Sequence, residues 1–280
     1  MATEVLQGRR EKGLEAAIGV LPEAVAWPVP GAADRDGGLG EEGAGRRSAV
    51  QPQDALWEGF WRKHGDGRSP LDLALWLTRR LLARRHARML TGYLRRMMPK
   101  DRIPLLTLEI GCGSAETSAS LSRIEAGTRL YGVDRSRGAV NLARKRNPGL
   151  RCVVGDALAL PFAPETFVLS FSSGVIEHFE RRQAARIVNE HWRVTGRRGT
   201  VAVVVPWKHS PYNLLRIMAG RHWPFGHERP FGRGELRAFI KAEPLSAVAI
   251  RSGYATTLLG LGTKVQGPSF ASGGETPRRR

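Results

Sequence analysis

The feature that most constrains the fold is a short glycine turn between an apolar run and a helical pattern, within LLTLEIGCGSAETSAS at 105–120. Residues 105–110 are mostly apolar, Gly111-Cys112-Gly113 interrupts them, and a helix can continue from Ala115. This order predicts a strand, a tight turn and a helix. Glycine suits such a turn because it tolerates positive φ and lets backbone N–H groups approach a ligand. The stretch is therefore typical of a nucleotide pocket in an α/β sheet.

A second apolar run, Leu130–Asp134, ends in a carboxylate about twenty residues beyond the glycines, the spacing at which an acid reaches ribose hydroxyls. Glu109 places another carboxylate at the end of the first strand. A dinucleotide fingerprint would need a third glycine where this chain has Glu116. The nicotinamide interpretation is therefore disfavoured.

Four motifs in order make the sequence similar to a known family. They are Glu109–Gly113, Gly132–Asp134, Val154–Ala157 followed by Leu160–Phe162, and Ser172–Phe179. In this order and spacing the sequence resembles the class I S-adenosylmethionine-dependent methyltransferases, particularly the group of ubiquinone and menaquinone biosynthesis. The resemblance is strong over about residues 105–206 and weak on both flanks.

The resemblance implies an α/β fold with a doubly wound, mostly parallel, seven-stranded Rossmann-like sheet, S-adenosyl-L-methionine as the cofactor, and no metal. In the family, the residue at Asp156 hydrogen-bonds the adenine amino group, and the backbone at Ala157 meets the ring. The expected cofactor-binding residues are Glu109, Gly111, Cys112, Gly113, Asp134, Arg135, Asp156, Ala157 and Ser173.

Hydrophobic patterns also predict the remaining elements of the domain. Further strands are expected at 150–155, 167–172 and 200–205, and helices at 136–146, 183–192 and 235–242. Residues 247–254 and 256–265 are weaker candidates for the last two strands, which we expect to be degenerate. Alternation of strands and helices at this rhythm predicts a parallel sheet covered on both faces.

The chain departs from the family pattern at several points. Ala115 stands at the third motif glycine, and Arg197-Arg198-Gly199 replaces a Pro-Gly-Gly turn, so we expect a strained φ there. Phe167-Val168 replaces Phe-Asp, and residues 242–245 replace an Ala-Gly-Phe turn. Most of these positions are turns or strand starts, so they concern stability and the C-terminal topology more than cofactor binding.

The domain organisation follows from composition. Residues 1–53 are rich in glycine, alanine and mixed charges, and 267–280 form a basic Gly/Ser/Pro tail, so both are expected to be disordered. Residues 54–266 form the methyltransferase domain, with a helical cap at 54–100 whose 61–67 stretch is expected to line the site. The cap contains an amphipathic, arginine-rich helix at 71–98. A packed helix with a solvated arginine face is favoured over contact with an anionic lipid surface or nucleic acid.

Residues 206–232 connect the fifth strand to the next helix, and a connection this long is usually functional. Its rings suit an apolar or aromatic small-molecule acceptor, so we interpret it as a lid. The predicted substrate-binding residues are Trp207, His209, Tyr212, Trp223, Phe225 and His227. A metal site formed by His209, His222, His227 and Glu228 is the alternative, although their spacing matches no zinc pattern. His178 is the candidate catalytic base, with a structural role in its turn as the favoured alternative.

The formal charge of +18 raises rival functions: an RNA-directed methyltransferase or a nucleic-acid-binding protein. The chain lacks a Pro-Pro dipeptide, so the motif of amino-group base methyltransferases is absent. A cofactor-binding fold without turnover is a third alternative. The 2 cysteines suit a reducing compartment, and we find no targeting or membrane-spanning pattern, so we expect a cytoplasmic protein.

Overall fold

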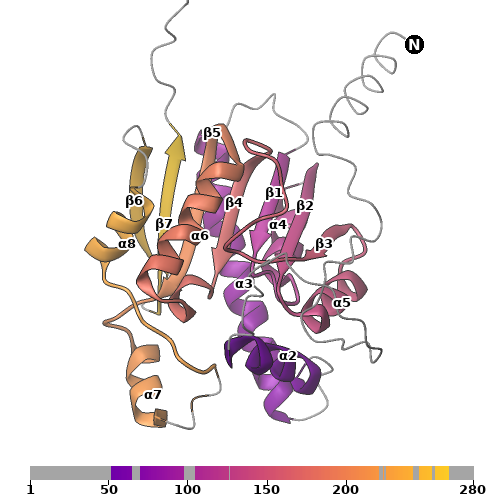
Figure 1. Ribbon diagram of the computed structural model, residues 1–280, viewed down its shortest axis with the longest axis vertical. Helices are drawn as coiled ribbons and strands as arrows, with labels where there is room; N and C mark the ends of the chain where they lie inside the picture. Colours follow the sequence, from indigo (N-terminus) through magenta and orange to yellow (C-terminus); the bar gives the residue numbers. More distant parts are fainter. Residues whose placement is uncertain are drawn as a thin grey trace, which may run out of the picture.

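The computed structural model describes residues 52–64, 70–97, 105–125, 127–220, 223, 225–241, 246–253 and 256–264. The expected disordered regions lie outside these residues, apart from Pro52 and Gln53. Figure 1 shows a twisted central sheet with helices on both faces. None of the described helices combines the length and the apolar character that crossing a bilayer requires.

The sheet has seven strands in the order β3-β2-β1-β4-β5-β7-β6. The first five strands in sequence pair in parallel, and β7 pairs antiparallel with both β5 and β6. The strands are β1 (Leu105–Ile110), β2 (Thr128–Asp134), β3 (Leu150–Val154), β4 (Phe167–Ser173), β5 (Thr195–Pro206), β6 (Ser246–Gly253) and β7 (Thr257–Lys264). This confirms the predicted Rossmann-like fold. The expectation of degenerate last strands was wrong, because β6 and β7 pair along eight positions.

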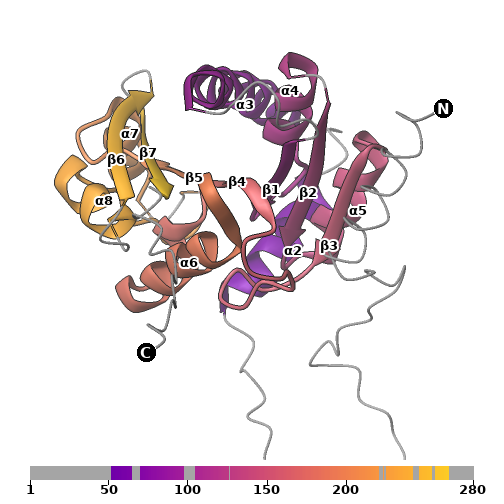
Figure 2. The same ribbon diagram turned by 90° about the horizontal axis from the view of Figure 1, so that it is seen from above.

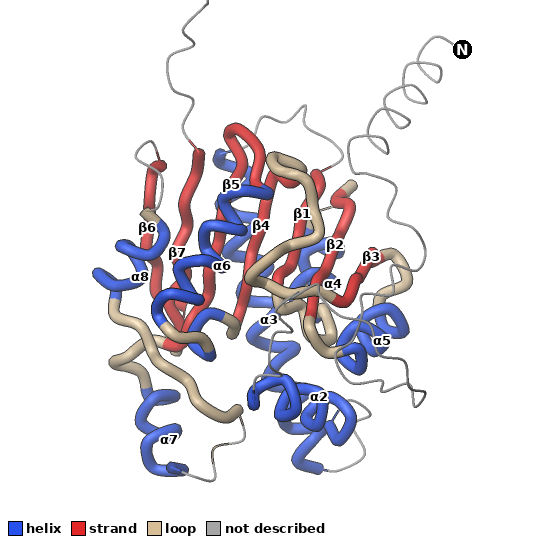
Figure 3. Tube along the Cα trace, viewed as in Figure 1, coloured by secondary structure: helices blue, strands red, loops and turns tan. Residues whose placement is uncertain are grey.

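Helices α6 (Arg181–Val194) and α8 (Arg233–Ile240) pack on one face of the sheet (Figure 2). Helices α4 (Glu116–Ile124) and α5 (Arg137–Arg146) and the second half of α3 (Pro70–Met97) pack on the other face. Two hydrophobic clusters fill these two layers. Helix α2 (Pro52–His64), the first half of α3 and α7 (Pro211–Ala219) gather at the end of the sheet where the parallel strands finish (Figures 1 and 3). The short 3-10 helix η1 (Ile176–His178) follows β4.

Two of the turns that depart from the family pattern have positive φ at residues other than glycine. Arg198 has φ 60° and Ala115 has φ 57°. Ala115 is also completely buried, immediately before α4. Side chains pay a steric cost in this region of the φ/ψ map. The strained φ predicted at 197–199 is therefore confirmed at Arg198.

His191 lies completely buried between α6 and β4, and its two ring nitrogens contact Ser170 Oγ (2.9 Å) and Ser172 Oγ (3.0 Å). Burial lowers the pKa of His191 from its usual 6.5 to about 3. Between pH 6.5 and 3 the unfolded chain binds a proton at His191 and the folded chain does not. The contribution of neutral His191 to the free energy of unfolding is therefore fully present above pH 6.5 and is lost as the pH falls toward 3.

We therefore expect acid to destabilise the protein less steeply when His191 is replaced. In His191→Gln, the slope of unfolding free energy against pH between about 6.5 and 3 should decrease by up to ~1.4 kcal/mol per pH unit. Urea unfolding at several pH values measures this slope, which does not depend on the variant's overall loss of stability. Equal slopes for the variant and the wild-type protein would contradict the assignment.

Candidate functional site

The glycine turn lies at the carboxyl end of β1. Gly111 and Gly113 have φ 64° and 53°, and the Cys112 N–H donates to the Val133 carbonyl (3.0 Å). A Cβ on Gly111 would lie 2.4 Å from Val175 Cγ2, so a side chain there would meet the segment that follows β4. Both positions therefore favour glycine through their backbone conformation and through close packing against neighbouring side chains.

Asp134 ends β2 and accepts two backbone hydrogen bonds, from Gly113 N–H (2.8 Å) and Ser136 N–H (2.9 Å). Burial raises the pKa of Asp134, and the two hydrogen bonds oppose that rise. Each carboxylate oxygen keeps further acceptor capacity, because it has two lone pairs. The carboxylate thus fixes the turn and can also accept from ribose hydroxyls.

The helical cap covers this turn directly. A Cβ on Gly113 would lie 2.6 Å from Trp61 Cζ2, and the Arg79 guanidinium lies 4.4 Å from the Trp61 ring centroid. Burial lowers the pKa of Arg79 to about 10, and the carboxylates of Glu116 and Asp134 oppose this effect. Trp61, the first residue of the 61–67 stretch, packs against the turn, whereas residues 65–67 lie outside the described residues. Arg79, which sequence analysis missed, has a guanidinium nitrogen 3.3 Å from the position of a Cβ on Gly113.

Glu109 is buried at the end of β1, where its carboxylate accepts from the Ser118 N–H of α4 (3.0 Å). Burial raises its pKa to about 7. Cys112 is also buried, and its sulfur lies 3.8 Å from that of Cys152. Glu109 therefore joins β1 to α4, and Cys112 joins the turn to β3.

The segment after β3 holds the expected adenine contacts. Asp156 Oδ1 accepts from the Leu158 N–H (2.9 Å), Asp156 Oδ2 lies 3.9 Å from the Arg135 guanidinium, and Ala157 is buried beside them. Asp134 and Val154 are paired in register, so Asp156 follows β3 close to the end of β2. Both acids are consequently placed at the same edge of the sheet.

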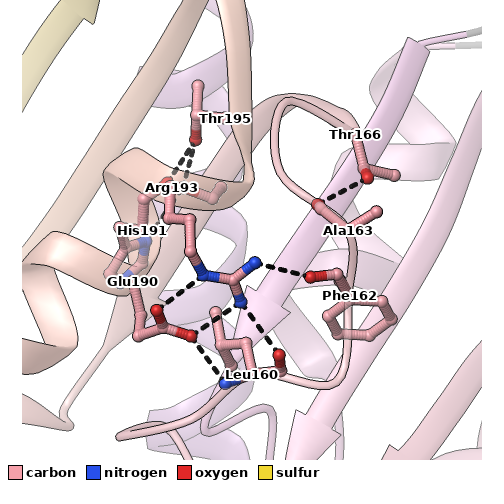
Figure 4. Close-up of polar contacts among 9 residues, drawn as sticks. Leu160, Phe162, Ala163, Thr166, Glu190, His191, Arg193 and Thr195 are labelled. Atoms are coloured by element: carbon pink, nitrogen blue, oxygen red, sulfur yellow. Dashed lines mark hydrogen bonds and ion pairs between the residues drawn. The ribbon is translucent and has the colours of Figure 1, made fainter.

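A network from α6 anchors this segment (Figure 4). The Arg193 guanidinium donates to the carbonyls of Leu160 (2.9 Å) and Phe162 (2.7 Å) and pairs with Glu190 (2.7 Å), whose carboxylate accepts from the Leu160 N–H (2.7 Å). These contacts hold the backbone that carries Asp156. The position of this loop thus depends on α6, a contact between distant residues that no local sequence pattern predicts.

The residues present fit S-adenosylmethionine. Asp134 and Asp156 can provide acceptors for ribose hydroxyls and an adenine amino group, and Arg79 can provide a half-buried cation for a carboxylate beside the glycine turn. Ser173, at the end of β4, has its hydroxyl 3.3 Å from His86 Nδ1 of α3. No group of three His, Cys, Asp or Glu side chains suited to a metal occurs in the described part of the chain.

A second group of polar and aromatic side chains surrounds His178 in η1. Its Nδ1–H donates to the His227 carbonyl (2.9 Å), and its Nε2 lies 4.0 Å from Glu228 Oε1. Burial lowers the pKa of His178 to about 4, so the ring is neutral near pH 7. Trp57 of the cap packs edge-on against the ring, with centroids 5.1 Å apart.

Glu228 connects His178 to the predicted lid. Its carboxylate, whose pKa is raised by burial, accepts from Tyr212 Oη–H (3.0 Å) and Trp223 Nε1–H (3.1 Å). The neighbouring Glu177 is also buried, which raises its pKa to about 8. Sequence reasoning considered Glu228 only as a metal ligand, and its proximity to His178 depends on a contact across fifty positions of chain.

The other predicted substrate residues are distributed differently. Phe225 contacts Phe60 of the cap, with ring centroids 6.0 Å apart, whereas His227 is exposed and contributes its carbonyl. Trp207 lies beside His209 at the start of the segment, with 6.2 Å between the ring centroids. The backbone N–H of Trp207 donates to the Thr256 carbonyl. The ring contacts that the structure describes do not join Trp207 or His209 to the cluster around His178.

Comparison with known proteins agrees with this geometry. Residues 108–203 match the family described as "Methyltransferase domain". A curated tRNA (carboxymethyluridine(34)-5-O)-methyltransferase of Saccharomyces cerevisiae is 30% identical over 100 residues, which are 36% of this chain and 34% of that protein. A 2-phytyl-1,4-naphtoquinone methyltransferase of Thermosynechococcus vestitus is 25% identical over 163 residues, 52% of this chain and 71% of that protein. The chain thus matches only about a third of the first relative.

A solved structure extends the likeness to the fold. The magnesium protoporphyrin IX methyltransferase of Synechocystis PCC 6803, determined with bound SAH, superposes with a TM-score of 0.57 at 16% identity, over 76% of this chain and 98% of that one. Residues 108–203 are therefore similar to methyltransferase domains in sequence, and the chain shares the fold of a solved methyltransferase.

Proposed function

We propose that this chain transfers a methyl group from S-adenosylmethionine to a small, apolar or aromatic acceptor. The observation that supports this most is a wall of rings from the cap and the 206–232 segment, with successive centroids 5.1 to 6.0 Å apart. The rings in order are Trp57, Phe60, Phe225, Trp223 and Tyr212. Such a wall provides large apolar surfaces with few polar groups, as small-molecule sites do.

The cofactor would be held by the groups at the strand ends: Asp134 for the ribose, Asp156 for the adenine and Arg79 for the methionine carboxylate. When bound, it supplies an activated methyl group on a sulfonium that leaves as a neutral thioether. The protein then mainly has to align the acceptor, an effect that can contribute ~7–11 kcal/mol in favourable cases. The ring wall is suited to that alignment and to excluding water.

We assign the proton that the acceptor heteroatom loses to His178. Its Nδ1–H donates to the His227 carbonyl, so in the neutral ring Nε2 carries the lone pair and is the basic nitrogen. The low pKa of about 4 keeps the ring unprotonated at neutral pH. Glu228, which binds both Tyr212 and Trp223, positions the ring wall around this nitrogen.

An acceptor screen with isotopically labelled cofactor, read out by mass spectrometry of the products, tests the proposal. On an acceptor found in this way, Tyr212→Ala and Trp223→Ala should each raise the Michaelis constant for the acceptor by roughly tenfold or more. Burying a ring against the acceptor contributes ~1.5–3 kcal/mol to acceptor binding. Cofactor affinity should change little, since these residues lie on the acceptor side. If these variants bound the cofactor weakly but showed normal acceptor kinetics, the 206–232 segment would belong to the cofactor site and not to the acceptor site.

One observation favours a second candidate, methyl transfer to RNA. The yeast relative is named as a tRNA methyltransferase, and this chain has a formal charge of +18. Guanidinium groups attract phosphates without reading the sequence. Including total tRNA in the screen separates the two cases: methylated tRNA, with no labelled small molecule, would favour the RNA-directed function.

A further inference from the structure

The described part of the chain has eight exposed large hydrophobic side chains, and all of them lie on α2, α3 or α7. Helix α7 carries four with exposed fractions between 59% and 74%, α3 carries three between 51% and 57%, and α2 carries one. They are Leu214, Leu215, Ile217 and Met218, then Leu73, Leu77 and Leu81, and Leu56. The helices that cover the sheet elsewhere expose none in the described chain. Apolar surface concentrated in this way usually marks an interaction site.

These side chains share one end of the molecule. The first half of α3, α2 and α7 all lie beyond the carboxyl ends of the parallel strands, at the bottom of Figure 1. On α3, Leu73, Leu77 and Leu81 recur every four residues, so they form one stripe along the helix. The buried Ala83, Ala87 and Leu90 lie on a different side of the same helix, roughly a third of a turn away around its axis. The leucine stripe is therefore a second apolar face, outside the core.

Cationic groups accompany the α3 stripe. Leu77 and Leu81 line a surface depression together with Arg80 and Arg84, and Arg88 is exposed one turn further on. None of the described carboxylates forms an ion pair with these three arginines. The surface thus combines aliphatic side chains with guanidinium groups, which bind phosphates in forked geometry.

We propose that this end of the molecule binds an anionic lipid surface, with the leucines of α3 and the apolar side of α7 entering the acyl boundary and the arginines contacting lipid phosphates. A bilayer accommodates two separate protruding helices, provided that both lie near one plane. RNA is less suited, because the exposed apolar side chains are all aliphatic and provide no stacking surface for bases. Because the arginines are complementary to negatively charged lipid headgroups, an anionic membrane is preferred over a neutral one.

The location gives this contact a consequence for the reaction. The glycine turn and His178 lie at the same end of the sheet. A membrane bound there would therefore face the side of the site from which the acceptor enters. An apolar acceptor dissolved in the bilayer would then reach the ring wall without crossing water. This consequence rests on the proposed function, whereas the lipid contact itself does not.

Co-sedimentation of the full chain with vesicles tests the contact without any acceptor. The wild-type protein should bind vesicles that contain phosphatidylglycerol and bind pure phosphatidylcholine vesicles at least roughly tenfold more weakly, with affinity for the former decreasing as salt is raised. Arg80→Gln/Arg84→Gln and Ile217→Ser/Met218→Ser should each weaken binding by roughly tenfold. The matched control is Arg182→Gln/Arg186→Gln, which removes two exposed charges from α6 and should bind like the wild-type protein.

Unchanged thermal unfolding and S-adenosylhomocysteine binding would show that the variants are folded, and further exposed positions such as Leu77→Ser replace any variant that is not. Equal losses in the α6 control and in the α3 variant would overturn the proposal, because binding would then follow net charge alone. A dimer in sedimentation velocity that Leu77→Ser dissociates would also overturn it and assign the surface to a second copy. Vesicle binding with no methylation of any acceptor would refute only the proposed function.

Discussion

Asp134→Ala is expected to weaken the binding of S-adenosylhomocysteine by roughly ten- to a hundredfold or more. The carboxylate accepts from two backbone N–H groups, including that of Gly113 in the glycine turn, and it is the acceptor that we assign to the ribose hydroxyls. A hydrogen bond to a charged group contributes ~1.5–3 kcal/mol, so losing both the ligand contact and the support of the turn exceeds a tenfold effect. Isothermal titration calorimetry measures the change directly.

Two further variants make this result specific. Glu125→Ala removes an acid that pairs with Arg95 at the C-terminal end of α4, away from the turn, and should leave the affinity unchanged. Asp134→Asn keeps the shape and one acceptor oxygen, so it should fall between the wild-type protein and the alanine variant. Unchanged affinity in Asp134→Ala, or tight binding of NADH, would refute the cofactor assignment.

Trp192→Ala is expected to lower the free energy of unfolding by about 3–5 kcal/mol, the usual cost of removing a buried tryptophan. Its ring packs against β7, where a Cβ on Gly262 would lie only 2.6 Å from Trp192 Cζ2. Its Nε1–H donates to the Ile240 carbonyl at the end of α8 (3.1 Å). One side chain thus joins α6, α8 and β7, and its loss leaves both a cavity and an unpaired carbonyl.

Urea unfolding followed by circular dichroism measures this loss. Trp192→Phe, which keeps most of the ring volume but loses the hydrogen bond, should cost clearly less than the alanine variant. Arg182→Ala, exposed on the same helix, should lie within ~0.5 kcal/mol of the wild-type protein. A loss below about 1 kcal/mol in Trp192→Ala would show that the α6–α8–β7 junction adjusts to the cavity.

Local patterns predicted the elements that carry the cofactor site. The apolar run ending at the glycine turn, the acid that ends β2 and the one that follows β3 appear in the sequence in the order in which the sheet uses them. The strained φ at Arg198 could also be expected, because a family glycine is missing there. In each case the signal lies within a few residues of the feature it predicts.

Contacts between distant elements could not be predicted in this way. Arg79 reaches Gly113 because α3 packs beside α4, and Glu228 reaches His178 because the 206–232 segment returns to η1. The amphipathic pattern at 71–98 predicted one buried side for this helix, and Ala83, Ala87 and Leu90 of α3 are indeed buried. It could not reveal that Leu73, Leu77 and Leu81 stay exposed, because that depends on where the sheet ends relative to the helix.

The position of β7 has a consequence for how the chain folds. β7 is the last described strand in sequence, yet it lies inside the sheet, paired with β5 on one side and β6 on the other. During synthesis, the buried edge of β5 therefore stays unpaired until residues 257–264 leave the ribosome. An unpaired apolar strand edge invites association with other chains. Nascent chains stalled before β7 should accordingly require a chaperone, even though the complete cofactor site has already been made.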